Sequence, residues 1–343
     1  MEILPLDSQK RPVALSVVIP CYNENTCLEE LYKRVTAVCK QHAQQSYEIV
    51  LVNDGSTDDT GQIIRGLTKK DHHVVGIDLA RNYGHQIALS AGLELSCGER
   101  ILILDADLQD PPELLAKMAA RMDEGFDVVY GQRQAREGEG WFKQVSAKVF
   151  YRMLGRMVDV YIAPDTGDFR LMNRRALDHL NAMPERFRFI RGMVSWIGLR
   201  QTALPYIRQE RFAGKTHYPL RKMFALAIDA ITSFSVVPLR FASHLGFFLG
   251  LMGLATLGYM LFAWATGDVV RGWTSLAALI VIIGSVQLLV LGIFGEYLGR
   301  MYMEAKRRPL YIINEVIAAE NHNDDEKMEA RQLQEKLKVA VDA

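Results

Sequence analysis

The sequence predicts an α/β domain followed by a pair of membrane-spanning helices, and three observations lead to this fold class. Short apolar segments alternate with helical segments in the first part of the 343-residue chain, a pattern typical of βαβ units and a parallel sheet. Carboxylates follow several of these apolar segments, at the position where parallel sheets bind ligands. Two uncharged apolar runs, residues 241–266 and 273–295, each exceed the roughly 20 residues that a helix needs to cross a bilayer.

The charge balance and the cysteines exclude some classes of function. Lysine plus arginine and aspartate plus glutamate each number 40, so the net charge is zero and no global basic field attracts nucleic acid. No apolar run follows a basic segment near the N-terminus, so no cleavable signal peptide is predicted. The four cysteines have neither zinc-ligand nor C-x-x-C spacing and are interpreted as reduced thiols in a cytosolic compartment. They are Cys21, Cys27, Cys39 and Cys97.

Five strands are predicted in the first domain, at residues 14–20, 47–53, 74–79, 101–104 and 127–130. Their apolar runs are typical of strands buried on both faces of a parallel sheet. The glycine-rich turn G-x-G-x-x-G does not follow the first strand. Its absence argues against a dinucleotide-binding oxidoreductase.

Helices are predicted between these strands. One covers residues 26–41, and a helix rich in small residues ends near Leu95. Pro112 and Glu113 then open a helix with a proline and an acid in its first turn.

The fourth predicted strand leads directly into Asp105 and Asp107, and the chain is interpreted as organised around this pair. Two carboxylates at the carboxyl end of a parallel strand suit Mg²⁺ or Mn²⁺ held jointly with the phosphates of a ligand. The alternative is an acidic loop that only caps the following helix. The motifs before and after the pair favour the metal site.

Two amphipathic helices are predicted beside the sheet. Residues 141–158 interleave basic and apolar side chains, which is typical of a helix lying on an anionic membrane surface. The alternative is a helix packed on the sheet with a solvated basic face. Residues 220–234 form the second amphipathic helix, and residues 208–218 form a basic loop before it.

The expected division of the chain follows from these elements. Residues 1–218 form the catalytic domain, 219–235 a juxtamembrane helix, 236–300 two membrane helices at about 241–266 and 273–298, and 301–343 a tail. Basic residues flank the outer ends of the two helices, whereas the turn between them holds one arginine and one aspartate. The positive-inside rule therefore places the catalytic domain and the tail in the cytoplasm.

Several motifs are similar to those of family 2 glycosyltransferases of the GT-A fold. Four of them are Val18-Ile-Pro-Cys-Tyr-Asn-Glu24, Val52-Asn-Asp-Gly-Ser-Thr-Asp58, Arg81-Asn-Tyr-Gly84 and Asp105-Ala-Asp-Leu-Gln-Asp-Pro-Pro112. Two further motifs, Thr166-Gly-Asp-Phe-Arg-Leu-Met172 and Gly295-Glu-Tyr-Leu-Gly-Arg300, resemble the polyprenyl-phosphate branch of this family. Within that branch the chain is most similar to the bacterial undecaprenyl-phosphate glucosyltransferases that modify O-antigen. Its resemblance to dolichyl-phosphate mannose synthases is more distant. The resemblance extends over residues 14–315.

The resemblance implies a UDP-sugar donor. In such enzymes the loop after the first strand, here with Pro20, Tyr22 and Glu24, lines the pocket for the base. The acid after the second strand, here Asp54, contacts the uracil ring, and a carboxylate can accept a hydrogen bond from the ring N–H. The alternative for Asp54 is a simple turn aspartate.

The resemblance also implies the metal and its ligands. Asp105 and Asp107, with Gln109 as a third contact, are expected to hold Mg²⁺ or Mn²⁺ against the diphosphate, and Ala106 is expected to line the nucleotide site. The metal neutralises charge on the departing UDP.

The implied acceptor is a lipid monophosphate, whose oxygen is already anionic at neutral pH because its second pKa lies near 6. No strong base is then required, and cations are needed around the phosphate. Arg133, Arg211, Lys215 and Arg170 are the candidates. Asp168 is expected near the acceptor as an orienting group or base, with a structural ion pair to Arg170 as the alternative. Direct attack on the anomeric carbon predicts inversion.

The chain departs from the family pattern at one place, and two alternative functions are also considered. Relatives often have Ser-Lys-Tyr after the glycine of the basic loop, where this chain has Lys215-Thr-His-Tyr218. A processive polysaccharide synthase is disfavoured because no Q-x-x-R-W segment is present. The other rival is a catalytically silent scaffold that binds nucleotide sugar or lipid phosphate. The resemblance further implies a homo-oligomer, a tetramer, in the bacterial inner membrane.

Overall fold

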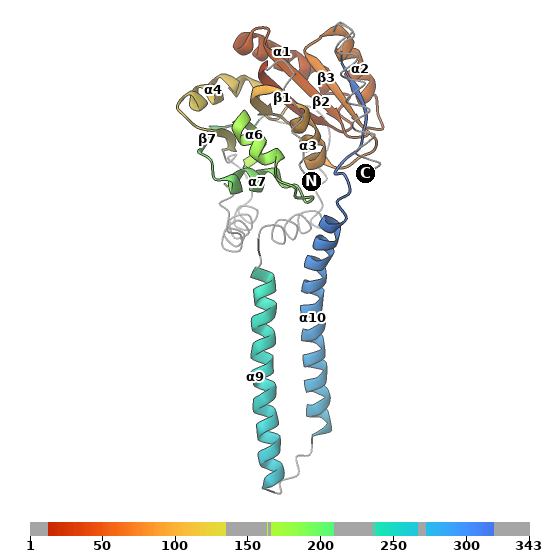
Figure 1. Ribbon diagram of the computed structural model, residues 1–343, viewed down its shortest axis with the longest axis vertical. Coiled ribbons are helices and arrows are strands. Elements are labelled where there is room, and N and C mark those ends of the chain that lie inside the picture. The colour runs from red at the N-terminus through yellow and green to blue at the C-terminus, as the bar shows by residue number, and fades with distance from the viewer. Residues whose placement is uncertain are drawn as a thin grey trace.

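A computed structural model describes residues 13–134, 163, 166–208, 235, 237–266 and 272–318 (Figure 1). An α/β domain lies at one end of a long pair of helices. The two amphipathic helices expected at residues 141–158 and 220–234 lie outside the described residues, as do Arg211 and Lys215.

The domain is built on one eight-stranded sheet with the strand order β7-β5-β6-β4-β1-β2-β3-β8. The strands are β1 (Val13–Cys21), β2 (Tyr47–Asn53), β3 (Val74–Leu79), β4 (Gly98–Ile103), β5 (Val128–Arg133), β6 (Thr166–Asn173), β7 (Gln201–Tyr206) and β8 (Ile313–Ile317). Strands β3, β2, β1 and β4 are mutually parallel, as are β5 and β7. Strand β6 runs antiparallel to β4 and β5, and β8 runs antiparallel to β3.

The α/β class is confirmed, but the expectation of a parallel sheet is wrong for β6 and β8. Neither segment has the apolar run from which the first five strands were predicted, and β7 was not predicted either. Strand β6 carries Asp168 and Arg170 inside an otherwise apolar stretch, and β8 includes Asn314 and Glu315. The segment after residue 300, expected to be a tail, thus returns to the domain and forms an edge of its sheet.

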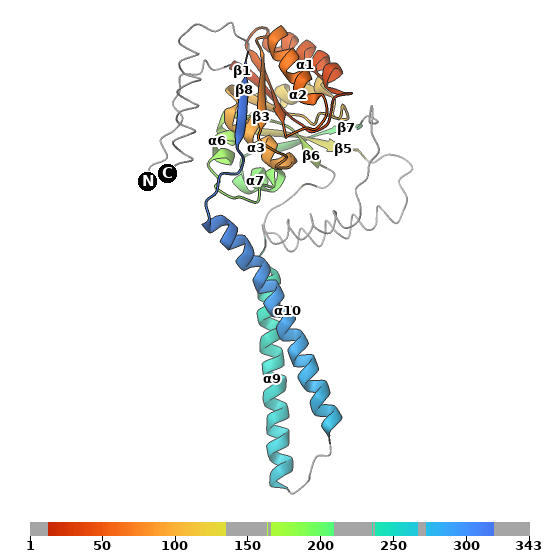
Figure 2. The same ribbon diagram turned by 90° about the vertical axis from the view of Figure 1, so that its right-hand side faces the viewer.

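Helices cover both faces of the sheet (Figures 1 and 2). They are α1 (Leu28–Ala43), α2 (Thr60–Lys70), α3 (His85–Leu95), α4 (Leu115–Asp123), α6 (Arg174–Asn181) and α7 (Ile190–Ile197), with a short 3-10 turn at Pro112–Leu114. Alternate residues of β1 enter opposite apolar layers: Val17 and Ile19 pack with α1, and Val18 packs with α3.

Small residues bring α3 very close to the sheet. A Cβ atom added at Gly92 would lie 2.5 Å from a methyl carbon of Val18 and 2.8 Å from one of Val52. Any larger residue would therefore push the helix outward. The close packing fixes the position of the helix N-terminus, where His85 begins α3 beside the carboxyl ends of the strands.

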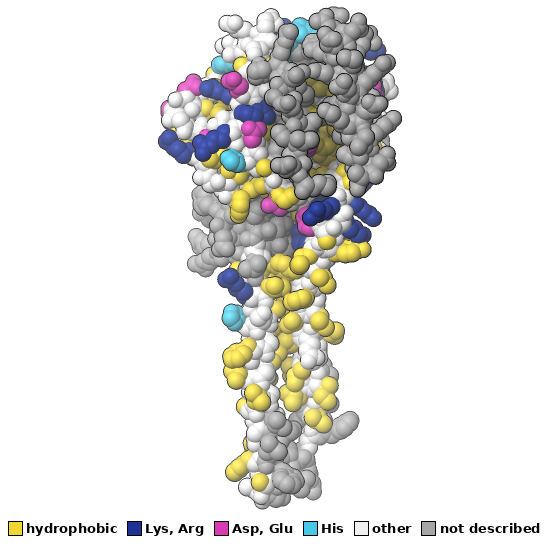
Figure 3. Space-filling model, viewed as in Figure 1, with side chains coloured by type: hydrophobic (Ala, Val, Ile, Leu, Met, Phe, Trp, Pro, Cys, Tyr) yellow, Lys and Arg dark blue, Asp and Glu magenta, His cyan; other side chains and the backbone are white. Residues whose placement is uncertain are grey.

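Two long apolar helices, α9 (Val237–Ala265) and α10 (Trp273–Ala305), extend from the domain (Figure 2). Both are long and apolar enough to cross a membrane. Only 6% of the most apolar stretch of α9, and none of that of α10, is buried in the structure. Such exposure is not that of helices in the core of a soluble protein. In Figure 3, hydrophobic side chains line the pair, and lysines and arginines gather where the helices meet the domain. The predicted pair of candidate membrane spans is thus confirmed.

Candidate active site

Asp105 and Asp107 follow β4, as the sequence predicts. Burial raises the pKa of Asp105 to about 6; the His85 charge opposes this rise, and the nearby carboxylates of Asp168 and Asp110 add to it. The Oδ1 atom of Asp105 is buried and has no hydrogen-bond partner among the described residues. A desolvated carboxylate oxygen of this kind is available to a cation, so the residues present fit a hard divalent ion.

The residues next to this pair form a tight loop around Asp107. Ala106 is buried between the two aspartates, and the buried Gln109 donates its backbone N–H to Oδ1 of Asp107 at 3.1 Å. Leu108 has a positive φ of 59°. The loop therefore turns sharply while it holds Asp107 in place.

Asp168 lies in β6, where it is 5% exposed, and four side chains surround it. Its Oδ2 atom lies 2.6 Å from Nε2 of Gln86 and 3.2 Å from Nε2 of His85. Its Oδ1 atom lies 3.3 Å from Nε of Arg191 and 3.9 Å from Nη2 of Arg170. Burial raises the pKa of Asp168, but the His85 hydrogen bond and the two arginines outweigh burial and leave it well below its usual range. Asp168 is consequently an anion at neutral pH.

The Asp168–Arg170 pair that the sequence suggested is present but long. The Arg170 guanidinium is buried and donates to the backbone carbonyls of Gly167, at 3.1 Å, and Asp168, at 3.2 Å. Its hydrogen bonds therefore hold its own strand, whereas Arg191 approaches the carboxylate more closely.

His85 joins the two acidic groups. Its Nε2 atom lies 3.4 Å from Oδ1 of Asp105 and 3.2 Å from Oδ2 of Asp168. Burial lowers the pKa of His85, but the hydrogen bond to Asp168 and the charges of both aspartates outweigh burial and raise it to about 8. Sequence reasoning missed His85, Gln86 and Arg191. The first two immediately follow the motif Arg81-Asn-Tyr-Gly84, which was the available signal.

Asp54 anchors the loop that leads into α3. It is buried, and its two carboxylate oxygens accept from the backbone N–H groups of Tyr83, at 2.7 Å, and Gly84, at 2.9 Å. Burial raises the pKa of Asp54 by more than these hydrogen bonds and nearby cations lower it. Asp54 therefore has the turn-stabilising role that was its alternative interpretation, and its contact with uracil remains a prediction.

The loop after β1 lies against the loop after β2. Pro20, the next-to-last residue of β1, is opposite Val52 of β2. Tyr22 is 46% exposed, and the backbone N–H of Glu24 donates to Oγ1 of Thr60 at 2.9 Å. The expected base-binding residues are thus held together at one edge of the sheet.

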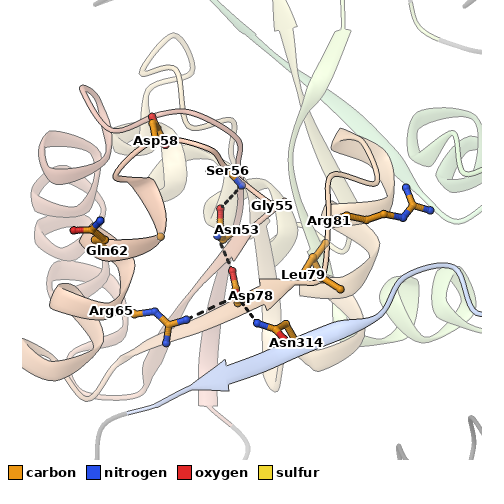
Figure 4. Close-up of a pocket in the computed structure, with 12 residues that line it drawn as sticks. Asn53, Gly55, Ser56, Asp58, Gln62, Arg65, Asp78, Leu79, Arg81 and Asn314 are labelled. Atoms are coloured by element: carbon orange, nitrogen blue, oxygen red, sulfur yellow. Dashed lines mark hydrogen bonds and ion pairs between the residues drawn. The ribbon is translucent and has the colours of Figure 1, made fainter.

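A polar pocket of about 410 Å³ adjoins these loops (Figure 4). The ends of β2 and β3, helix α2 and strand β8 line it. Figure 4 shows Asn53, Asp78 and Asn314 in one hydrogen-bonded row along its wall.

Arg133 approaches the acidic cluster from the end of β5. Its Nε atom donates to the Tyr206 hydroxyl at 3.4 Å, and that hydroxyl donates to the buried carboxylate of Asp110. A Cβ atom at Gly167 would lie 2.5 Å from Nη2 of Arg133, so the glycine leaves room for this side chain. Arg208, the first residue of the basic loop predicted at residues 208–218, lies 3.6 Å from Asp107.

The cluster combines buried negative charge with nearby cations. Asp105, Asp110 and Asp168 each retain one buried oxygen that accepts no hydrogen bond from any residue in the described part of the chain. Arg133 and Arg208 lie beside Asp110, and Arg208 also lies beside Asp107. Such an arrangement can hold a divalent cation together with the phosphates of a ligand.

Comparison with known proteins places this site in context. The family model for glycosyl transferase family 2 matches residues 16–180. An uncharacterized glycosyltransferase, YkcC, of Bacillus subtilis (strain 168) is 44% identical over 91% of this chain and 96% of its own length. A prophage bactoprenol glucosyl transferase homolog of Escherichia coli (strain K12) is 37% identical over 88% of this chain and 99% of its own. The bactoprenol glucosyl transferase of Shigella phage SfV is 37% identical over 87% and 97%.

Proposed function

The chain belongs to glycosyl transferase family 2, with a GT-A-like mixed α/β sheet, and from this premise we propose that it transfers glucose from a UDP-sugar to undecaprenyl phosphate. Relatives that are 37% identical over nearly their whole length are named for glucosyl transfer to bactoprenol, which supports this sugar and this acceptor. The enzyme would act at the cytoplasmic face of a bacterial inner membrane. The configuration at the anomeric carbon would be inverted.

The single observation that carries the proposal is the convergence of three acidic groups at one edge of the sheet. Asp105, with Asp107 two residues further on, and Asp168 come from different strand ends, and His85 lies within 3.4 Å of both Asp105 and Asp168. A silent binding protein has no need to desolvate several carboxylates at one place, since each desolvated charge reduces stability. Such groups are typical of an active site.

For the donor, we propose that Asp105 and Asp107, with Gln109, hold Mg²⁺ or Mn²⁺. When bound, the ion would neutralise charge on the UDP leaving group. The loops that hold Tyr22, Glu24 and Asp54 lie at the same edge of the sheet and would surround the base and ribose.

For the acceptor, we propose that cations draw the lipid phosphate toward the donor. A phosphate oxygen forms the new bond to the anomeric carbon while the bond to the UDP oxygen breaks, and the pair of electrons leaves with UDP. Arg133 is suited to hold the incoming phosphate because it projects beside the carboxylate cluster. Arg211 and Lys215 would add to this charge. Asp168, kept anionic by His85, Arg191 and Arg170, would orient these cations and does not need to remove a proton.

The two apolar helices support a lipid acceptor. A polyprenyl tail remains in the bilayer, so the site must lie close to the membrane surface. We propose that α9 and α10 span the bilayer and hold the domain at its inner face, where the lysines and arginines at the domain end would meet anionic headgroups (Figure 3).

The test is turnover by the purified full-length protein with Mg²⁺, undecaprenyl phosphate and a panel of UDP-sugars, with the lipid product measured by mass. We expect glucosylated lipid with UDP-glucose, and none from the Asp105→Ala variant. The matched control is Asp123→Ala, which removes an exposed carboxylate on α4. Absence of turnover with every donor would contradict the proposal, and full activity in Asp105→Ala would favour a different active centre.

A further inference from the structure

A row of hydrogen bonds leads from strand β8 to the loop after β2 (Figure 4). The side-chain amide of Asn314 donates to Oδ2 of Asp78 at 3.0 Å. The other oxygen of Asp78 accepts from the side-chain amide of Asn53 at 2.6 Å. Asp78 therefore links three strands through one carboxylate, because Asn53 ends β2, Asp78 lies in β3 and Asn314 lies in β8.

The row continues into the loops of the proposed donor site. The carbonyl oxygen of the Asn53 side chain accepts from the backbone N–H of Ser56 at 3.1 Å. The Ser56 hydroxyl in turn accepts from the backbone N–H of Asn23 at 3.1 Å. Gly55, which lies between Asn53 and Ser56 in the chain, has a positive φ of 62°. Asn53 thus fixes the turn that brings the loop after β2 against the loop after β1.

The same turn touches the third loop of the site. A Cβ atom at Gly55 would lie 2.5 Å from backbone atoms of Arg81 and Asn82. Asp54, one residue earlier, binds the backbone N–H groups of Tyr83 and Gly84. A shift of this turn would consequently move all three loops relative to one another.

The carboxylate of Asp78 is well placed for this linking role. Its side chain is 17% exposed, and Arg65 of α2 lies 3.8 Å from it. Arg65 is also 2.5 Å from Glu315, the neighbour of Asn314 in β8. Two amides and one guanidinium therefore surround Asp78, and it has no place in the acidic cluster around Asp105.

Strand β8 connects this row to the long helices. Only residues 306–312 separate the end of α10 from β8. This connection is fixed to the domain: Glu304 accepts from the backbone N–H of Arg186 at 2.7 Å, and the hydroxyl of Tyr311 donates to Glu94. The segment that closes the helical pair is therefore held against the domain by hydrogen bonds on both sides of the connection.

We propose that Asp78 is a positioning residue for the donor nucleotide, supported from β8 by Asn314. Neither residue touches the donor; both hold the turn at Gly55 and thereby the loops that enclose the base and ribose. This inference rests on the proposed function, because it takes the nucleotide of a UDP-sugar as the ligand of those loops.

The experiment measures steady-state kinetics and UDP binding for the full-length protein with Mg²⁺. Asn314→Ala removes one donor to Asp78, and Asp78→Asn places an amide where Asn53 or Asn314 needs an acceptor. The lost hydrogen bonds should raise KM for the UDP-sugar and Kd for UDP about 3-fold in Asn314→Ala and about 10-fold in Asp78→Asn. We expect kcat within about 2-fold of the original value and an unchanged KM for undecaprenyl phosphate.

The matched control is Glu315→Ala, one residue along the same strand. It removes the ion pair with Arg65 but leaves the row from Asn314 to Ser56 intact, so the donor KM should not change. The double variant of Asp78→Asn and Asn314→Ala should have the same KM for the UDP-sugar as Asp78→Asn alone, because both changes act through the hydrogen bonds of Asp78.

A merely structural role predicts a different result. It would lower the unfolding temperature and the fraction of active enzyme, and hence kcat, with both KM values unchanged. That result, or equal increases in both KM values, would overturn the inference while turnover by the original protein upheld the proposed function. An original protein that neither turns over nor binds UDP would overturn both.

Discussion

Asp105 and Asp107 follow β4 at the centre of the sheet, and Oδ1 of Asp105 is buried without a hydrogen bond from any described residue. Such a loss of solvation requires a nearby positive charge, which His85 supplies in part and which a metal ion would supply in the proposed complex. The individual residues of the site can therefore be assigned different roles. In the proposed mechanism the acidic pair would provide the metal ligands, and His85 and Asp168 lie beside them.

The first prediction concerns this pair. Asp105→Asn preserves size but removes the charge that holds the metal, so kcat/KM should fall by at least about 100-fold. The assay is lipid glucosylation at saturating Mg²⁺, followed by titration with Mn²⁺. Asp123→Asn, on the exposed face of α4, should retain normal activity. Activity in Asp105→Asn that equals this control would remove the acidic pair from the mechanism.

The second prediction concerns the stability that Asp168 provides. Asp168→Asn leaves Arg170 and Arg191 without their buried counter-charge, which should lower the free energy of unfolding by about 3 kcal/mol at neutral pH. Because the pKa of Asp168 is depressed in the folded protein, its contribution is complete above the unfolded pKa of about 3.9 and is lost as the pH falls through the folded pKa.

Unfolding in detergent at several pH values checks this prediction. The difference between the original protein and Asp168→Asn should be largest near pH 6 and should shrink as the pH rises through 8, because Asp168 also stabilises the charged form of His85, whose pKa it helps to raise to about 8. Asp178→Asn, an exposed acid on α6, serves as the control. Equal stability of Asp168→Asn and the original protein would mean that the arginines have other counter-charges.

At the scale of elements, the loops around the donor site depend on one backbone conformation. Gly55 has a φ of 62°, and a Cβ atom there would meet the backbone of Arg81 and Asn82 at 2.5 Å. Backbone atoms cannot move away from such a contact as easily as the end of a flexible side chain can. The turn after β2 and the loop before α3 are therefore in direct contact only because this residue has no side chain.

The third prediction follows from that contact. Gly55→Ala should lower the free energy of unfolding by about 2 kcal/mol and raise the donor KM, since both the positive φ and the close approach disfavour a side chain. Gly66→Ala is the matched control: nothing lies within 4 Å of its added Cβ in α2, and alanine is the better helix former. It should be neutral or slightly stabilising in thermal unfolding. A Gly55→Ala protein as stable and active as Gly66→Ala would contradict this view of the turn.

Apolar runs and turn residues were enough to predict the first five strands and the helical pair. Strand β6 could not be predicted in this way because its buried residues include the charged Asp168 and Arg170, and Asp168 has its nearest cationic partners, His85 and Arg191, far away in the sequence. Strand β8 is a short edge strand that pairs with β3 across more than 200 residues of sequence, so nothing local specifies it. Acidic residues of the site were found from their motifs, whereas Arg191 had no motif near it.

At the scale of the whole molecule, both helices of the pair have one end at the domain. Helix α9 begins there and α10 returns there before β8 joins the sheet (Figure 1). The domain and residue 318 must consequently lie on the same side of any membrane that the pair crosses. The basic residues are divided unevenly between the two ends of the pair. Arg240, Arg300, Lys306, Arg307 and Arg308 lie at the domain end, and the turn 266–272 contains Arg271 alone.

The fourth prediction is the orientation that this charge asymmetry dictates. The positive-inside rule places the domain end in the cytoplasm and Gly272 outside. In a Cys97→Ser background, where the other three cysteines are buried, Gly272→Cys should react with a membrane-impermeant maleimide on intact cells. Ile312→Cys, at an exposed position before β8, should react only after the cells are opened. The reverse pattern would put the active site on the side where UDP-sugars are not made, and the proposed donor would then have to be abandoned along with the orientation.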